Sequence, residues 1–155
     1  MITIRVQPGP FDLATETTAL TAGRTDIGAI VSFTGLVRDH PLTLEHYPAM
    51  TEKALHRIAN EATARWPLHG LTIIHRFGPL LPADPIVLVL TASAHRAAAF
   101  ESAMFLMDWL KTCAPFWKKS PEGWVEAKTD DDAAAQRWHS PLPFRGGAGG
   151  GEIMS

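Results

Sequence analysis

The 155-residue chain is 46% hydrophobic and 19% charged, with a net charge of −2 at neutral pH. These values describe a folded globular domain with a sizeable core, and they exclude a disordered chain. They also give no global electrostatic case for binding nucleic acid or an anionic membrane. The sequence has no apolar run near the roughly 20 residues of a membrane-spanning helix and no secretory segment at its start, so we expect a cytoplasmic protein.

Hydrophobic periodicity and turn residues predict the helices and strands. The predicted strands cover residues 2–6, 27–37, 42–47, 71–77, 86–92, 116–119 and 124–128. The predicted helices cover residues 11–20, 50–66 and 95–112, with a further helical turn or two at 130–138. Thr51 or a neighbour could cap the second helix, and Ser93 the third. The strand at 86–92 is apolar throughout, which predicts a central position in the sheet with both faces buried.

Together these elements predict an α+β domain over residues 1–138, with two long helices packed on a mainly antiparallel β-sheet and a small additional β subdomain. Residues 139–155 are rich in proline and glycine, and we expect them to form a flexible tail.

Three lysines gather in the segment 110–119, beside two large aromatic side chains. On a near-neutral chain this local basic spot favours a small anionic ligand. Lys111 and Lys118 lie seven residues apart across a proline turn, so their amines can converge on one pocket. There, each would lower the pKa of the other and favour a neutral, nucleophilic or basic amine. The alternative is a pair of solvated lysines flanking an amphipathic strand, and spacing alone does not distinguish the two. Alternation along the strand puts Lys118 and Lys119 on opposite faces, one inward and one outward.

The third helix carries cationic residues at both ends. His95 and Arg96 lie at its start and Lys111 at its end, about 24 Å away at the α-helical rise. One small-molecule pocket in one subunit cannot include both ends. Either the ends serve different purposes, or two copies of the chain form a symmetric dimer with shared sites. Lys111 also suits the helix dipole, and His95 and Arg96 could be ordinary exposed first-turn residues.

The other chemistry-bearing residues give weaker signals. The single cysteine, Cys113, excludes an intrachain disulfide and a cysteine-based zinc site, and we interpret it as a small buried hydrophobe rather than a reactive thiol. The histidines lack metal-binding spacing, so no metal or cofactor is predicted. Arg38 follows a predicted strand and could bind an anion in bidentate fashion, although a surface ion pair is the commoner use.

Seven collinear segments closely resemble the catalytic (large) subunit family of molybdopterin synthase. They are residues 28–38, 42–55, 74–78, 93–101, 110–112, 114–119 and 124–127. The blocks Leu-Glu-His-Tyr-Pro at 44–48 and Ala-Pro-Phe-Trp-Lys at 114–118 are the most specific. The resemblance covers residues 1–138 and implies a hammerhead-like α/β fold.

The resemblance implies a sulfurtransferase of molybdenum cofactor biosynthesis. Such an enzyme inserts two dithiolene sulfurs into cyclic pyranopterin monophosphate to make molybdopterin. The sulfur arrives as a C-terminal Gly-Gly thiocarboxylate on a small ubiquitin-like carrier subunit. Family members are homodimers with one carrier at each end, a heterotetramer, and the neighbouring subunit completes each pocket. The alternative is a non-catalytic module that only docks a ubiquitin-like carrier.

The resemblance also assigns roles residue by residue. Lys111 would act nearest the sulfur-transfer chemistry, as acid/base or as transient covalent partner of the carrier's carboxyl, and Lys118 would stabilise developing negative charge. His95 and Arg96 would reach the substrate from the partner subunit. The substrate-binding residues that it implies are Leu36, Val37, Arg38, His95, Arg96, Lys119, Ser120 and Lys128, with Phe33 and Met107 as pocket wall.

The chain also departs from the family pattern. Leu36 stands where a lysine is common, so its side chain is not expected to be essential. The loop after Arg38 is shorter than in many relatives. Cys113 occupies a position that often holds arginine, which argues against a role as sulfur donor.

Overall fold

A computed structural model of the chain describes residues 1–120, 123–125 and 138. It has two four-stranded sheets and three helices in this part of the chain. The first sheet has the order β1 (Ile2–Gln7), β4 (Leu68–Arg76), β6 (Pro85–Ser93), β2 (Ala29–Leu36). The second has the order β5 (Gly78–Leu80), β3 (Leu42–His46), β7 (Phe116–Ser120), β8 (Gly123–Val125). The helices are α1 (Leu13–Thr21), α2 (Pro48–Arg65) and α3 (Arg96–Thr112).

Strand β6 lies inside the first sheet, as its continuous apolar sequence predicts. It pairs antiparallel with both β4 and β2, whereas β1 pairs parallel with β4. Its side chains alternate between two apolar clusters: Val87 and Val89 belong to one, and Leu88 and Leu90 to the other. The mixed α+β class and the mainly antiparallel sheet are therefore confirmed.

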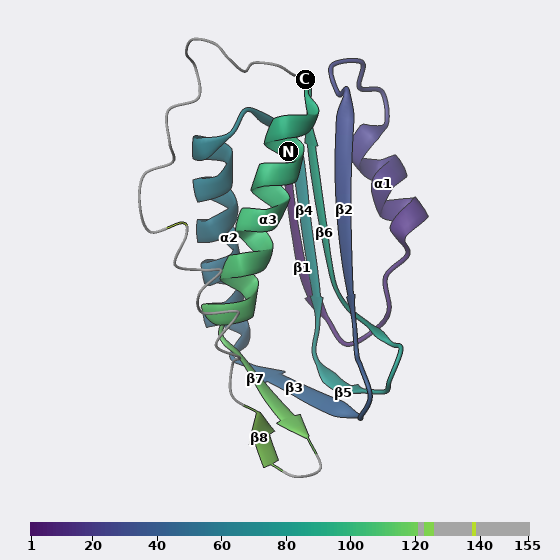
Figure 1. Cartoon of the computed structure of the whole chain (residues 1–155), viewed down its shortest axis with the longest axis vertical. Helices are drawn as coiled ribbons and strands as arrows, with labels where there is room; N and C mark the ends of the chain where they lie inside the picture. Colours follow the sequence, from purple (N-terminus) through teal and green to yellow (C-terminus); the bar gives the residue numbers. More distant parts are fainter. Residues whose placement is uncertain (121–122, 126–137, 139–155) are drawn as a thin grey trace.

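The helices cover the two faces of this sheet unequally. Helices α2 and α3 lie on one face and the shorter α1 on the other (Figure 1). The larger cluster joins Leu55 of α2 and Leu106 of α3 to the sheet, and the smaller joins Leu20 of α1 to the opposite face. Burial of these apolar side chains is the main force that fixes α3, and hence both of its ends, on the sheet. None of the described helices is long and apolar enough to cross a membrane.

The second sheet lies beyond the end of α3, below the first sheet in Figure 1. Its own small core consists of Val37, Leu44 and Leu80. The predicted strands at 42–47 and 116–119 are confirmed here, where β3 pairs antiparallel with β7. The predicted turn after residue 77 contains the short strand β5, which pairs with β3 and was not predicted.

Some predictions for the end of the chain fall where the structure describes little. The strand predicted at 124–128 is represented by β8 as far as Val125, and residues 126–128 lie outside the described residues. The predicted helical turn at 130–138, apart from Trp138, and the predicted tail at 139–155 lie outside them as well.

Both predicted helix caps are wrong. Helix α2 starts earlier than expected, at Pro48, whose fixed φ suits a first helical position. Thr51 is therefore inside the helix, fully buried, with Oγ1 3.1 Å from Nδ1 of His46. Ser93 is the last residue of β6, and its hydroxyl donates to the backbone carbonyl of His95. His95 is the N-cap residue of α3 and makes no side-chain capping bond.

Candidate active site

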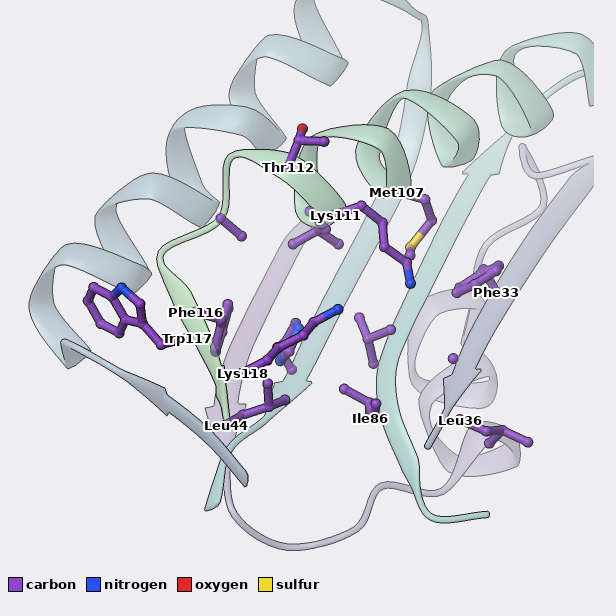
Figure 2. Close-up of a pocket in the computed structure, with 15 residues that line it drawn as sticks. Phe33, Leu36, Leu44, Ile86, Met107, Lys111, Thr112, Phe116, Trp117 and Lys118 are labelled. Carbon is purple, nitrogen blue, oxygen red and sulfur yellow. The ribbon is translucent and has the colours of Figure 1, made fainter. Parts of the chain in front are cut away.

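A cavity of about 230 Å³ lies where the end of α3 meets the second sheet. Figure 2 shows this cavity, with α3 above it and β7 along one wall. Side chains from α3, β7, β4 and β2 line it, among them Lys111, Lys118, Phe116, His75, Phe33 and Met107. It is mostly apolar with a few polar groups, the usual character of a small-molecule site.

The structure brings Lys111 and Lys118 to this one cavity. Lys111 comes from the last turn of α3 and is exposed, whereas Lys118 comes from β7 and is half-buried. Figure 2 shows their side chains pointing toward one another across the cavity. The proline turn between them reverses the chain, which is why a sequence separation of seven residues becomes a convergence in space. The inward orientation of Lys118 agrees with the prediction that strand alternation turns one of the two lysines, Lys118 and Lys119, inward.

Trp117 lies between Phe116 and Lys118 on β7, and its side chain points to the opposite side of the strand. The residue is 41% exposed, and its ring packs edge-on against Tyr47, with ring centroids 4.9 Å apart. Strand alternation explains this division, because neighbouring residues face opposite sides of a sheet. The side chains of Lys119 and Ser120 are not described, although their backbone pairs in β7 with β3 and β8.

The residues predicted from the end of β2 divide into three groups. Phe33 and Leu36 line the cavity, as Met107 of α3 also does. Val37 is buried in the small core of the second sheet and does not line the cavity. Arg38 is exposed, with its Nε 3.9 Å from a carboxylate oxygen of Asp39, and it does not line the cavity in the described part of the chain. The ion pair that we weighed as the alternative for Arg38 is thus present, although exposed pairs of this kind contribute little to stability.

His95 and Arg96 lie at the opposite end of α3 from the cavity. The helix spans Arg96–Thr112, so its two ends are separated by most of the length of the sheet (Figure 1). The structure therefore does not bring these residues to Lys111 within one chain. Lys128 lies outside the described residues.

Cys113 does not match its predicted environment. It is exposed at the end of α3, with Sγ 3.4 Å from the Thr112 hydroxyl oxygen, and is not a buried small hydrophobe. The reason is that the helix ends there, so the position that would have faced the core is turned outward. Cys113 lies on a separate groove beside Trp109 and Trp138, away from the lysine cavity. Among the described residues, no group of three metal-binding side chains gathers anywhere.

Among the titratable residues that line the cavity, sequence reasoning missed His75. The residue is 8% exposed, and its imidazole stacks on the Phe116 ring, with centroids 3.8 Å apart and planes 16° from parallel. Nδ1 lies 2.9 Å from the backbone carbonyl oxygen of Arg76. Burial lowers the pKa of His75 to about 4, against the Arg76 hydrogen bond that raises it, and the nearby charges of Lys118, His46 and Lys111 lower it further. The only signal in the sequence that could have pointed to His75 was its position as a polar residue near the end of the apolar strand β4.

Comparison with known proteins identifies the family to which this chain belongs. The family model described as "MoaE protein" matches residues 6–113. The molybdopterin synthase catalytic subunit of Mesorhizobium japonicum is 58% identical over 149 residues, which cover 89% of this chain and 94% of that protein. The chain belongs to the MoaE family, the molybdopterin synthase catalytic subunits.

Solved structures agree with this assignment. The molybdopterin biosynthesis MoaE protein of Burkholderia ambifaria superposes with a TM-score of 0.81 at 53% identity, covering 91% of this chain and all of that chain. Molybdopterin synthase of Staphylococcus aureus superposes with a TM-score of 0.68 at 32% identity, covering 79% of this chain and 91% of that one. The match to the MoaE family model ends at residue 113 of this chain, so it includes Lys111 but not Lys118.

Proposed function

We propose that this chain converts cyclic pyranopterin monophosphate to molybdopterin, taking two dithiolene sulfurs from a thiocarboxylated ubiquitin-like carrier. The observation that carries the proposal is the pair of lysine side chains pointing toward one another in one cavity of a MoaE-family chain. Both the substrate phosphate and the carrier's thiocarboxylate are anions. Two ammonium groups in a mostly apolar pocket attract them more strongly than the same groups would in open water.

The two lysines differ in their surroundings, which supports a division of roles. Lys111 is exposed at the mouth of the cavity, where an incoming carrier tail would meet it first. We assign it the acid/base or transient covalent role in sulfur transfer. Lys118 is half-buried beside Phe116, and we assign it the stabilisation of negative charge that develops during transfer. Phe33 and Met107 would form the wall against the pterin.

The remaining predicted residues fit a site completed by a second copy of the chain. Phe100 and Met104 are 61% and 50% exposed on α3, and they follow one face of the helix toward Lys111. Exposed apolar stripes of this kind are typical of protein–protein contacts. We propose that a second subunit covers this stripe and brings its His95 and Arg96 to the cavity. Arg38 and the segment with Lys119, Ser120 and Lys128 would contact the substrate from the same subunit as the lysines.

The direct test of the proposed function is reconstitution. The purified chain, its thiocarboxylated carrier and cyclic pyranopterin monophosphate are mixed, and dithiolene product is measured. We expect product in proportion to the carrier consumed, two carriers for each molybdopterin. Carrier binding without any product would contradict the enzymatic proposal and leave the docking module as the function.

The shared site predicts complementation between two inactive variants. Lys111→Ala and Arg96→Ala homodimers should each be inactive, but after subunit exchange the mixed dimer has one intact site. Since half of the dimers are then mixed, about a quarter of wild-type turnover should return. The control is a mixture of Lys111→Ala with Lys118→Ala, in which both changes affect the cavity of their own subunit, so no site is restored. No recovery in the first mixture would show that the sites are not shared.

We also propose that residues 1–138 form the catalytic domain, that residues 139–155 are a tail beyond it, and that the protein acts in the cytoplasm. The alignment with the Mesorhizobium japonicum relative covers 89% of this chain, which supports the proposed extent of the catalytic domain. The cytoplasmic location is supported by membership of a biosynthetic enzyme family and by the absence of a membrane-spanning helix among the described residues.

A further inference from the structure

His75 is a buried, titratable group in the wall of the lysine cavity that the proposed mechanism does not use. Its Nδ1 lies 2.9 Å from the carbonyl oxygen of Arg76. A carbonyl oxygen only accepts hydrogen bonds, so Nδ1 must carry the hydrogen. In the neutral ring the lone pair is then on Nε2, which makes Nε2 the one ring nitrogen that can accept a hydrogen bond.

Burial, together with the charges around His75, keeps the ring neutral. In the described part of the chain, the groups that act on it are Lys118 from β7, Lys111 from α3 and His46 from β3, all of them bases. Arg76, the next residue of β4, turns its guanidinium away to the carbonyl oxygens of Pro8 and Pro85. A protonated imidazole would place another cation beside these bases. Its Nε2 would then carry a hydrogen and could no longer accept a hydrogen bond. Burial acts in the same direction.

Strand geometry places Lys118 beside this imidazole. Phe116 and Lys118 are two residues apart on β7 and share the face that lines the cavity. Because the Phe116 ring lies flat on the His75 ring, the Lys118 stem leaves the strand next to the same imidazole. Figure 2 shows that stem running from the Phe116 and Leu44 side into the cavity, toward Lys111.

We infer that His75 is a positioning residue, whose Nε2 accepts a hydrogen bond from the Lys118 ammonium and holds that amine opposite Lys111. A carboxylate could hold the lysine too, but it would neutralise the charge that an anionic substrate needs. A neutral imidazole fixes the position of the ammonium and leaves its charge available. The inference rests on the proposed function, because the position of Lys118 matters only if this cavity carries out the sulfur transfer.

Three variants of His75 separate its two ring nitrogens. His75→Gln places an amide oxygen near the position of Nε2, His75→Asn replaces only the Nδ1 donor, and His75→Phe keeps the stacked ring with neither nitrogen. We expect kcat to fall roughly 10- to 100-fold in the Asn and Phe variants, with KM little changed, because a displaced catalytic group slows the transferring step. The Gln variant should stay within a few-fold of wild type. If the Phe variant does not fold, the Gln and Asn comparison decides, and equal activity of these two would overturn the inference.

The matched control is His46→Phe. The His46 ring also lies near that of Phe116, tilted, with ring centroids 5.6 Å apart, but it does not line the lysine cavity in the described part of the chain. We expect its kcat per folded molecule to stay within about twofold of wild type. A loss equal to that of His75→Phe would mean that the packing of Phe116, and not the Nε2 acceptor, sets the rate.

A second readout does not depend on catalysis. In protein labelled with 15N-lysine, the ammonium signal of Lys118, assigned with a Lys118→Arg variant, should be protected from exchange with water in wild type and His75→Gln. It should be lost in His75→Phe. Equal signals in wild type and His75→Phe would overturn the inference even if the enzyme is active. A protected signal in a protein that makes no dithiolene would instead contradict the proposed function alone.

Discussion

Replacing Lys111 by alanine should lower molybdopterin formation by about 10²- to 10⁴-fold, the range that loss of a positioned acid/base or charge-stabilising group produces. The fold should survive, because the side chain is exposed at the last turn of α3 and packs into no core cluster among the described residues. Its loss removes only a favourable interaction with the helix dipole, about 0.3–1 kcal/mol. Single-turnover assays with thiocarboxylated carrier measure the rate, and urea unfolding measures stability.

The matched control for this result is Lys53→Ala. Lys53 is also an exposed helical lysine, on α2, and it does not line the cavity. Its turnover should equal that of wild type. A Lys111→Ala enzyme with unchanged turnover would place the sulfur-transfer chemistry elsewhere in the protein.

Lowering the pH from 6.5 to 4 should destabilise the wild-type protein more than the His75→Gln variant. The pKa of His75 falls from 6.5 in the unfolded chain to about 4 in the fold. In this window the unfolded state binds a proton that the folded state refuses, so the free energy of unfolding rises with pH. The expected difference between wild type and variant grows from near zero above pH 6.5 to roughly 3 kcal/mol at pH 4.

Urea unfolding at several pH values measures this difference. His46, whose pKa burial also lowers, is present in both proteins and cancels in the comparison. The carboxyl of Asp26, whose hydrogen bond with Arg24 lowers its pKa to about 2, stabilises the fold above its unfolded pKa of 3.8. That contribution is lost as the pH falls from 3.8 to about 2, below the pH range of the His75 comparison. Parallel profiles for wild type and His75→Gln would show that His75 does not titrate differently in the two states.

The sequence predicted those parts of the site that depend on local spacing. The apolar run of β6 and the long α3 were enough to predict a central strand and a helix, and the proline turn before Phe116 raised the convergence of two lysines as one of two alternatives. Each of these follows from periodicity or chain reversal over fewer than 20 residues. The fold class followed from the order of these elements.

What the sequence could not predict depends on contacts between distant segments. His75 became visible only when the fold brought its ring, from β4 of the first sheet, onto that of Phe116 from β7 of the second, because its proposed role depends on the ring of Phe116. The cap predicted at Thr51 failed because α2 begins at Pro48, which leaves Thr51 inside the helix, where its hydroxyl contacts His46 of β3. Cys113 was wrongly predicted as buried because one residue at a helix end determines whether a side chain faces inward.

The proposed placement of site residues at both ends of α3 has a genetic consequence. In the proposed dimer each α3 gives Lys111 to one centre and His95 with Arg96 to the other, so one chain takes part in both. A copy altered at only one end of the helix would damage one centre of a mixed dimer. A copy altered at both ends would silence both, and such an allele would behave as dominant beside a normal one.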